Sequence, residues 1–236
     1  MTITTDNIII PVAGSDMGAY VARPETGKAP ALIVLQEAFG VNDHIKDVTR
    51  RLAQQGYVAI APELFHRTAP VGFTAGYGDF ALLGDHFYAV TAESITEDML
   101  AVHEWLLGDR QVDPGHIGAI GFCLGGRASY IANAKLPLKA AVSYYGGGIV
   151  PNLLPLAAEQ HGPILFAWGG LDKHLTLEQR TAVTTAMTEA NKPYIAAVFS
   201  DAEHAFFCDA RPAYNANAAR QAWALTLSFL ATHLKT

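Results

Sequence analysis

The sequence contains only two cysteines, Cys123 and Cys208, in 236 residues. Two cysteines cannot form the disulfide framework that is typical of small secreted domains, and a free thiol suits a reducing compartment. Charged residues make up only 16% of the chain, which has a net charge of −6 and no cluster of Lys or Arg. The lack of a basic surface argues against nucleic acid as a partner and against binding to an anionic membrane.

Long hydrophobic runs are also missing. Residues 8–10 are three consecutive isoleucines, and no run reaches the ~18 apolar residues that a membrane-spanning helix needs. The first seven residues are polar and lack the basic start of a secretory signal peptide. We therefore expect a cytoplasmic protein with no membrane partner. Because 50% of the residues are hydrophobic, the chain can bury a large core, and we expect residues 1–236 to form a single α/β domain.

Short apolar runs alternate with stretches of helical spacing along most of the chain. Strands are predicted at 7–12, 18–23, 31–35, 57–61, 117–120, 138–145, 163–168 and 194–199. Helices are predicted at 43–55, 94–107, 127–132, 175–190 and 215–234, the second of them starting with a capping box from Ser94 to Glu97. This alternation predicts a mostly parallel sheet with helices on both faces and an edge hairpin from the first two strands. The aromatic-rich stretch 63–84 has no clear period, which is typical of a functional lid.

The stretch around Cys123 has the pattern of a strand, a sharp turn and a helix. It reads Gly-Phe-Cys-Leu-Gly-Gly over residues 121–126, which matches the G-x-S-x-G nucleophile elbow of α/β-hydrolases with Cys in place of Ser. Glycines on both sides of Cys123 allow the backbone to approach itself closely in such a turn. By itself the stretch fits equally well a structural cysteine in a glycine-rich turn, since free cysteine is among the most buried residue types.

In an open α/β sheet, ligands bind beyond the carboxyl ends of the strands. Polar residues follow the predicted strands at Gln36-Glu37, Glu63, Cys123, Tyr144-Tyr145, Asp172 and Glu203-His204. Cys123, Asp172 and His204 come in the nucleophile, acid, base order of the α/β-hydrolases. This order favours a catalytic triad, in which Cys123 attacks a carbonyl, His204 transfers the proton and Asp172 orients His204. The N–H groups of Leu124 and Ala38 are the expected oxyanion hole.

Several other residues can be interpreted either as part of the site or as structural. Glu37 directly follows a buried strand, where a carboxylate needs either a catalytic role or a partner such as Arg127. His174 could line the site, whereas we expect His44, with the histidines at 103 and 233, on helix surfaces. No H-E-x-x-H motif or Cys/His cluster is present, so we expect no metal and no other cofactor. Cys208 is interpreted as a bystander near the site.

The sequence resembles the dienelactone hydrolase (carboxymethylenebutenolidase) family over nearly its whole length. The resemblance rests on the segments 34–40, 57–64, 121–126, 144–146, 169–172 and 202–206. It implies an α/β-hydrolase fold, a Cys-His-Asp triad and hydrolysis of a small-molecule lactone or ester. It also implies that Glu37 interacts with the resting thiol and helps to form the thiolate when substrate arrives.

The sequence departs from this family where the substrate carboxylate is held. Dienelactone-cleaving members use arginines for that purpose, one of them four residues after the catalytic histidine, and here that residue is Cys208. The segment 72–91, where another such arginine is expected, contains no Arg or Lys. Arg67 and Arg211 are the nearest substitutes. The departure weakens the expectation of a small anionic dienelactone as the substrate.

Aromatic residues are the remaining indication of the substrate. We expect Phe39, Tyr88, Tyr145 and Phe206 to contact it in an apolar pocket, although aromatic residues of this region can equally pack a lid. The predicted function is a lactone or ester hydrolase that acts as a monomer or weak homodimer. A general carboxylesterase or thioesterase of apolar substrates is the alternative. A thiol redox protein and a non-catalytic binding protein on the same scaffold are alternatives of a different class.

Overall fold

The computed structural model describes residues 1–25 and 27–235. The chain divides into two compact units, Met1–Ile117 and Gly118–Thr236, and the division falls inside strand β5 (Val112–Phe122). The eight strands of the described residues belong to one mixed, mostly parallel sheet, which confirms the predicted α/β class. The expectation of a single domain over residues 1–236 stays a prediction.

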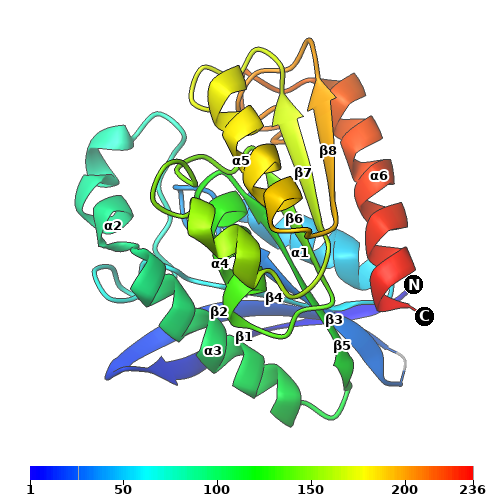
Figure 1. The fold of residues 1–236 in the computed structure, drawn as a ribbon. Helices are drawn as coiled ribbons and strands as arrows, with labels where there is room; N and C mark the ends of the chain where they lie inside the picture. The colour runs from blue at the N-terminus through cyan, green and yellow to red at the C-terminus, as the bar shows by residue number, and fades with distance from the viewer. Residues whose placement is uncertain (26, 236) are drawn as a thin grey trace. The chain divides into compact units, whose positions relative to one another are not determined.

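Strands are present at all the predicted positions (Figure 1), although the first and the fifth begin four and five residues before their predicted starts. Besides β5 they are β1 (Ile3–Val12), β2 (Ser15–Pro24), β3 (Ala29–Leu35), β4 (Val58–Pro62), β6 (Ala140–Tyr144), β7 (Ile164–Gly169) and β8 (Tyr194–Phe199). The α-helices are α1 (Asp43–Gln54), α2 (Gly84–Ala89), α3 (Ala92–Gly108), α4 (Leu124–Lys135), α5 (Leu177–Glu189) and α6 (Ala216–Leu234). Two short 3₁₀ helices, η1 (Phe80–Leu82) and η2 (Leu154–Glu159), complete the elements.

In the first unit, β1 and β2 form the predicted antiparallel hairpin, with Val12 paired to Ser15. The turn of this hairpin consists of Ala13 and Gly14, which take positive φ values of 48° and 83°. Two central residues with positive φ match the right-handed twist of the strands, so β2 can start at Ser15. β2 also pairs antiparallel with β4, and β3 pairs parallel with β4.

Helix starts show how local chemistry sets the element boundaries. The Asn42 side chain accepts a hydrogen bond from the Ile45 N–H and so caps the start of α1. The predicted capping box of α3 was wrong, because Thr91 is the cap and Ser94 is its partner three residues later. Both boxes have compatible spacing, and the cap that the chain uses adds almost one turn to the helix.

In the second unit, β5, β6, β7 and β8 run parallel in chain order. Side chains alternate between the two faces of each strand. Phe166 and Trp168 of β7 pack with Tyr130 of α4 and Val183 of α5, whereas Tyr144 of β6 shares a hydrogen bond with a residue of α6. The unit is therefore a parallel sheet covered on both faces, with α5 and α6 on opposite sides of β7 and β8 (Figure 1).

The helices of the described residues are too short or too polar to cross a bilayer. Within residues 1–25 and 27–235, none is both long enough and apolar enough to span a membrane. The longest, α6, has 19 residues and ends at Leu234.

Candidate active site

Cys123 occupies a sharp turn between β5 and α4. Its backbone has φ 54° and ψ −111°, a conformation that a residue with a side chain rarely adopts. The Cys123 N–H donates to the Tyr144 carbonyl at 3.0 Å, and the Arg127 N–H donates to the Cys123 carbonyl at 3.2 Å. The predicted strand, turn and helix are therefore present, and the cysteine remains partly exposed. Strained backbone of this kind is concentrated at functional sites.

Two glycines near Cys123 leave no room for a side chain. A Cβ on Gly121 would overlap the carbonyl group of Gly125, and a Cβ on Gly126 would lie 2.5 Å from the Tyr144 carbonyl oxygen. Interiors this closely packed cannot absorb an added methyl group without moving the backbone. The glycines of the motif thus let the elbow close on itself and let α4 approach β6.

Asp172 and His204 lie on the loops that follow β7 and β8. Nδ1 of His204 lies 2.7 Å from Oδ2 of Asp172. Oδ1 of Asp172 accepts hydrogen bonds from the N–H groups of His174 at 2.8 Å and Leu175 at 3.1 Å. Both carboxylate oxygens of this buried side chain are therefore engaged. The loop of Asp172 fixes its carboxylate and directs it at the imidazole.

The neighbours of His204 determine its charge. Burial alone would lower the pKa of His204, but hydrogen bonds to Asp172 and Cys123 and the negative charges of both groups raise it to about 10. Burial alone would raise the pKa of Asp172, but His204 and two backbone N–H groups hold it below its usual range. A carboxylate paired with an imidazolium is thus the favoured state at neutral pH.

Arg127 brings a second positive charge one helical turn after Cys123. Burial lowers the pKa of the Arg127 guanidinium, and a negative charge on Cys123 acts in the opposite direction. Nη1 of Arg127 would lie 2.9 Å from a Cβ on Gly148, so the guanidinium covers the glycine loop after β6. Together with the N-terminus of α4, this guanidinium places positive charge beside Cys123.

Two of the predicted substrate contacts, Tyr145 and Phe206, pack beside His204. The ring centroid of Tyr145 lies 5.1 Å from that of His204 and 5.5 Å from that of Phe206. Both aromatic side chains are fully buried. The structure therefore brings both side chains close to His204, and their contact with a substrate stays a prediction.

His174 is the neighbour of His204 that the sequence left undecided. Its ring centroid lies 5.1 Å from that of His204 in a T-shaped arrangement, and its side chain is exposed. The only signal for this placement in the sequence is the spacing of two residues after Asp172. Because the acid loop turns at Asp172, it carries His174 to the rim of the base.

Four further predicted site residues belong to the first unit. Glu37 directly follows β3 and is 1% exposed, and Ala38 beside it is half-buried. Phe39 is buried against the ring of Tyr77 at 4.8 Å between centroids. Tyr88, on α2, is 82% exposed. The roles of Glu37, Ala38, Phe39 and Tyr88 in catalysis or binding stay predictions.

Arg67, one of the possible substitutes for a carboxylate-binding arginine, is engaged inside its own unit. Its Nη1 lies 2.8 Å from Oδ1 of Asp98, and its Nη2 lies 2.9 Å from a carboxylate oxygen of Glu97. The fully buried Asp98 also binds Nε2 of His66 at 2.9 Å. Arg67 thus neutralises a buried carboxylate, which gives it a structural role and weighs against substrate binding.

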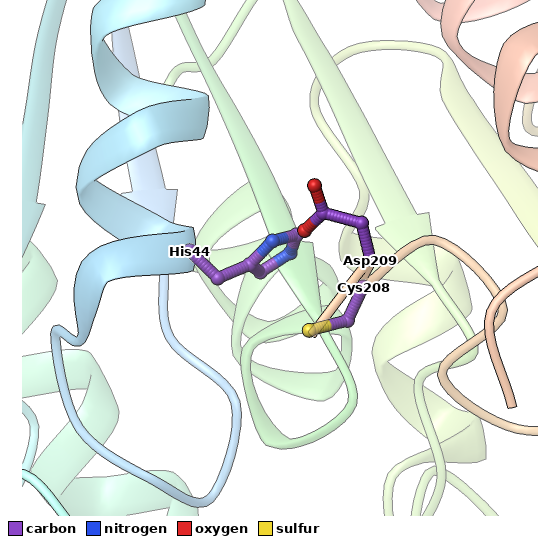
Figure 2. Close-up of side chains that lie close together, drawn as sticks. All are labelled: His44, Cys208 and Asp209. Atoms are coloured by element: carbon purple, nitrogen blue, oxygen red, sulfur yellow. The ribbon is translucent and has the colours of Figure 1, made fainter. Parts of the chain in front are cut away.

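Figure 2 shows the side chains of Cys208, Asp209 and His44. Cys208 is a fully buried cysteine whose N–H donates to the Ala205 carbonyl at 3.0 Å, whereas Asp209 is exposed. His44, on α1 of the first unit, is only 8% exposed. The predicted surface position of His44 was wrong, because the face that α1 buries is wide enough to include both His44 and Ile45.

Residues 17–234 match the model of the "Dienelactone hydrolase family". The chain belongs to the dienelactone hydrolase family. The carboxymethylenebutenolidase of Pseudomonas putida is 31% identical over 92% of both chains. A Synechocystis protein provisionally named carboxymethylenebutenolidase is 37% identical over 99% of this chain and 98% of its own. Both relatives cover nearly the full length.

The solved structures agree with this assignment. A crystal structure from Klebsiella pneumoniae, provisionally described as a dienelactone hydrolase, has a TM-score of 0.88 and 33% identity over 98% of this chain and 99% of its own. The fold is therefore the α/β-hydrolase fold, and the chain is a dienelactone hydrolase-like hydrolase. Both agree with what the sequence resemblance implied.

Proposed function

We propose that the chain hydrolyses a lactone or carboxylic ester with Cys123 as nucleophile, His204 as proton-transfer group and Asp172 as orienting acid. One observation carries the proposal: His204 is hydrogen-bonded to both Asp172 and Cys123, and Cys123 lies in a strained turn at the start of α4. Such a chain of acid, base and nucleophile defines a catalytic triad by its geometry, whatever its sequence positions.

The reaction proceeds in two steps. In acylation, the Cys123 thiolate attacks the carbonyl carbon, a C–S bond forms, the ester C–O bond breaks, and the His204 imidazolium gives its proton to the leaving oxygen. In deacylation, neutral His204 takes a proton from water, whose oxygen attacks the thioester. The C–S bond then breaks, which releases the carboxylic acid and restores the thiolate beside the imidazolium.

The raised pKa of His204 suits this sequence of events. With a pKa of about 10, His204 carries a proton at neutral pH once the arrival of substrate has converted the resting Cys123 thiol into a thiolate. That proton serves the leaving group in the first step. Once the sulfur is acylated, its negative charge is gone, so the imidazole becomes less basic and is free to accept a proton from water.

The tetrahedral intermediate needs N–H donors for its oxyanion. Leu124 is the first residue of α4, where backbone N–H groups have no partner within the helix. We assign the first donor to its N–H and the second to the N–H of Ala38. Glu37 is assigned the role that the family resemblance implies, in which it contacts the resting thiol and helps to form the thiolate when substrate arrives.

The substrate class rests on the family and on the composition of the site. The names of the relatives suggest a dienelactone, but Cys208 replaces a carboxylate-binding arginine and Arg67 is bound to Asp98. Neutral lactones and apolar esters are therefore substrates to test beside the anionic dienelactone. Tyr145, Phe206, Phe39 and Tyr88 are the proposed substrate contacts.

The decisive experiment is acid-quenched mass spectrometry after mixing with an anionic dienelactone, a neutral lactone and an apolar activated ester. We expect an acyl adduct on the peptide that contains Cys123, no adduct in Cys123→Ala, and an unchanged adduct in Cys208→Ser. Hydrolysis by Cys123→Ala at the wild-type rate would refute the mechanism. A Cys123–Cys208 disulfide in place of an acyl adduct would favour the thiol redox function.

A further inference from the structure

Arg180 is a buried cation close to the proposed acid. It is only 8% exposed, and among the residues that the structure describes its guanidinium forms no ion pair with a carboxylate. Its Nη1 donates to the Gly169 carbonyl at 2.5 Å, and its Nε is buried without a hydrogen-bond partner. Burying a guanidinium with so few partners costs free energy. A buried arginine with this cost is expected where its guanidinium holds a segment that the protein needs in a fixed position.

The two ends of the acid loop meet at Arg180. The loop runs from Gly169, the last residue of β7, to Thr176, the cap of α5, and it carries Asp172. The Arg180 N–H donates to the Thr176 carbonyl at 3.0 Å, while its side chain reaches back to Gly169. A single residue therefore closes the loop into a ring, because its backbone holds one end and its guanidinium holds the other.

The same loop is packed directly on the loop that carries His204. The Leu171 N–H donates to the Ala202 carbonyl at 2.9 Å, and the Gly170 N–H donates to the Phe199 carbonyl at 2.7 Å. A Cβ on Gly169 would lie 2.5 Å from the Ala202 carbonyl oxygen. The backbone of Gly169 is thus contacted by Arg180 on one side and by the loop that carries His204 on the other.

From this arrangement we infer that Arg180 is a positioning residue for the Asp172–His204 pair, an inference that rests on the proposed function. Arg180 touches neither reacting atom. It holds Gly169, and through Gly169 it holds the loop that presents the Asp172 carboxylate to His204. Misplacement of about 1 Å at a catalytic group can cost about 10²-fold in rate. Loss of Arg180 should therefore slow the chemical step more than it weakens substrate binding.

The position of Asp172 can be followed through the pKa of His204, which also depends on the other groups around the imidazole ring. The groups that face the His204 ring in the second unit are Asp172, Cys123, His174 and Tyr145. None of them is altered by a substitution at Arg180. A change in the titration of His204 in such a variant therefore reports the position of Asp172.

The test compares Arg180→Met and Arg180→Lys with the control Arg220→Met. Arg220 is an exposed arginine on α6 that binds Asn217, so its loss removes a similar side chain away from the site. For each variant we would measure kcat and KM on an ester that acylates Cys123 and titrate the His204 imidazole by NMR. We would also record thermal unfolding.

For Arg180→Met we expect kcat to fall about tenfold or more, with KM within about twofold, because the acid moves while the binding surface stays. The His204 titration should shift downward toward that of an ordinary imidazole. Arg180→Lys keeps the charge and one donor, so its kcat should fall only about threefold and its titration should be intermediate. Arg220→Met should match the wild type in both measurements.

Wild-type kcat and His204 titration in a folded Arg180→Met protein would overturn the inference and leave Arg180 a merely structural residue. If Arg180→Met does not fold, Arg180→Lys decides, and wild-type values in that variant overturn the inference equally. If the wild-type protein hydrolyses no ester, the proposed function fails. The NMR titration then still tests whether Arg180 positions Asp172 against His204.

Discussion

The Nδ1 atom of His204 lies 2.7 Å from Oδ2 of Asp172, while Oδ1 of the same carboxylate is held by two backbone N–H groups. In this geometry Nδ1 of His204 is hydrogen-bonded to Asp172, so only Nε2 is available to interact with Cys123. It also gives the carboxylate a single orientation, because each oxygen has its own donors. The pair is therefore rigid before any substrate arrives, as electrostatic catalysis requires.

Asp172→Asn should lower kcat/KM for an activated ester about 10⁴-fold, because an amide cannot stabilise the imidazolium and favours the wrong tautomer of His204. Steady-state kinetics on purified protein would measure the loss. Glu203→Gln is the matched control, since Glu203 is an exposed carboxylate next to His204 in the sequence. If Asp172→Asn keeps its activity and Glu203→Gln loses it, the acid is Glu203.

The stability of the protein should fall as the pH rises from about 6.5 to about 10. The folded-state pKa of His204 is raised to about 10 from its ordinary value of 6.5, so folding favours its protonated form. That stabilisation is complete below pH 6.5 and is lost as the pH passes through the folded-state value. Urea unfolding at several pH values would measure it. If the free energy of unfolding of His204→Gln falls just as steeply with pH, the pH dependence does not come from His204.

Gly121→Ala should destabilise the protein by about 3 kcal/mol, because the added Cβ overlaps the Gly125 carbonyl and forces the elbow open. The same variant should lose most of its esterase activity, since Cys123 and the start of α4 move with the elbow. Denaturant unfolding and ester turnover are the measurements. Gly108→Ala, where a Cβ meets nothing within 4 Å, is the control. Equal stability of the two variants would show that the elbow tolerates the methyl group.

Asp98→Asn should destabilise the first unit by about 3 kcal/mol, since removing one partner of a buried ion pair leaves the other charge uncompensated. Asp98 is fully buried between Arg67 and His66. Glu97→Gln is the control, because Glu97 binds the same Arg67 from a side chain that is 56% exposed. Glu97→Gln should lower the free energy of unfolding, measured with urea, by less than about 1 kcal/mol. If both variants lose the same free energy of unfolding, burial of Asp98 does not determine the strength of its ion pair.

Much of the fold could be predicted because its signals are local. Continuous apolar runs specified the buried parallel strands, and the Asn42 side chain fixed the start of α1 through a hydrogen bond within one turn. The start of α3 could not be predicted as well. Thr91 and Ser94 both have cap-compatible spacing, and local sequence alone does not decide which of the two begins the helix.

Among the candidate site residues, Cys123, Asp172 and His204 could be proposed from the sequence because each follows an apolar strand. Three other placements had little or no local signal. His174 reaches the His204 ring only because the acid loop turns, and Arg67 is held by a carboxylate 31 positions along the chain. His44 is buried because α1 buries a wide face, although a histidine in a helix is usually a surface residue.

The sequence by itself determined the strand ends, the glycine-flanked cysteine and the order of the three candidate catalytic residues. These follow from apolar periodicity and from the steric needs of a tight turn, which act over a few neighbouring residues. Only the tertiary structure decided that Asp172 and His204 meet at 2.7 Å and that Arg180, an ordinary helix residue in the sequence, closes the acid loop onto Gly169. Those contacts join residues on different loops and elements, so they exist only after β7, β8 and α5 have packed together.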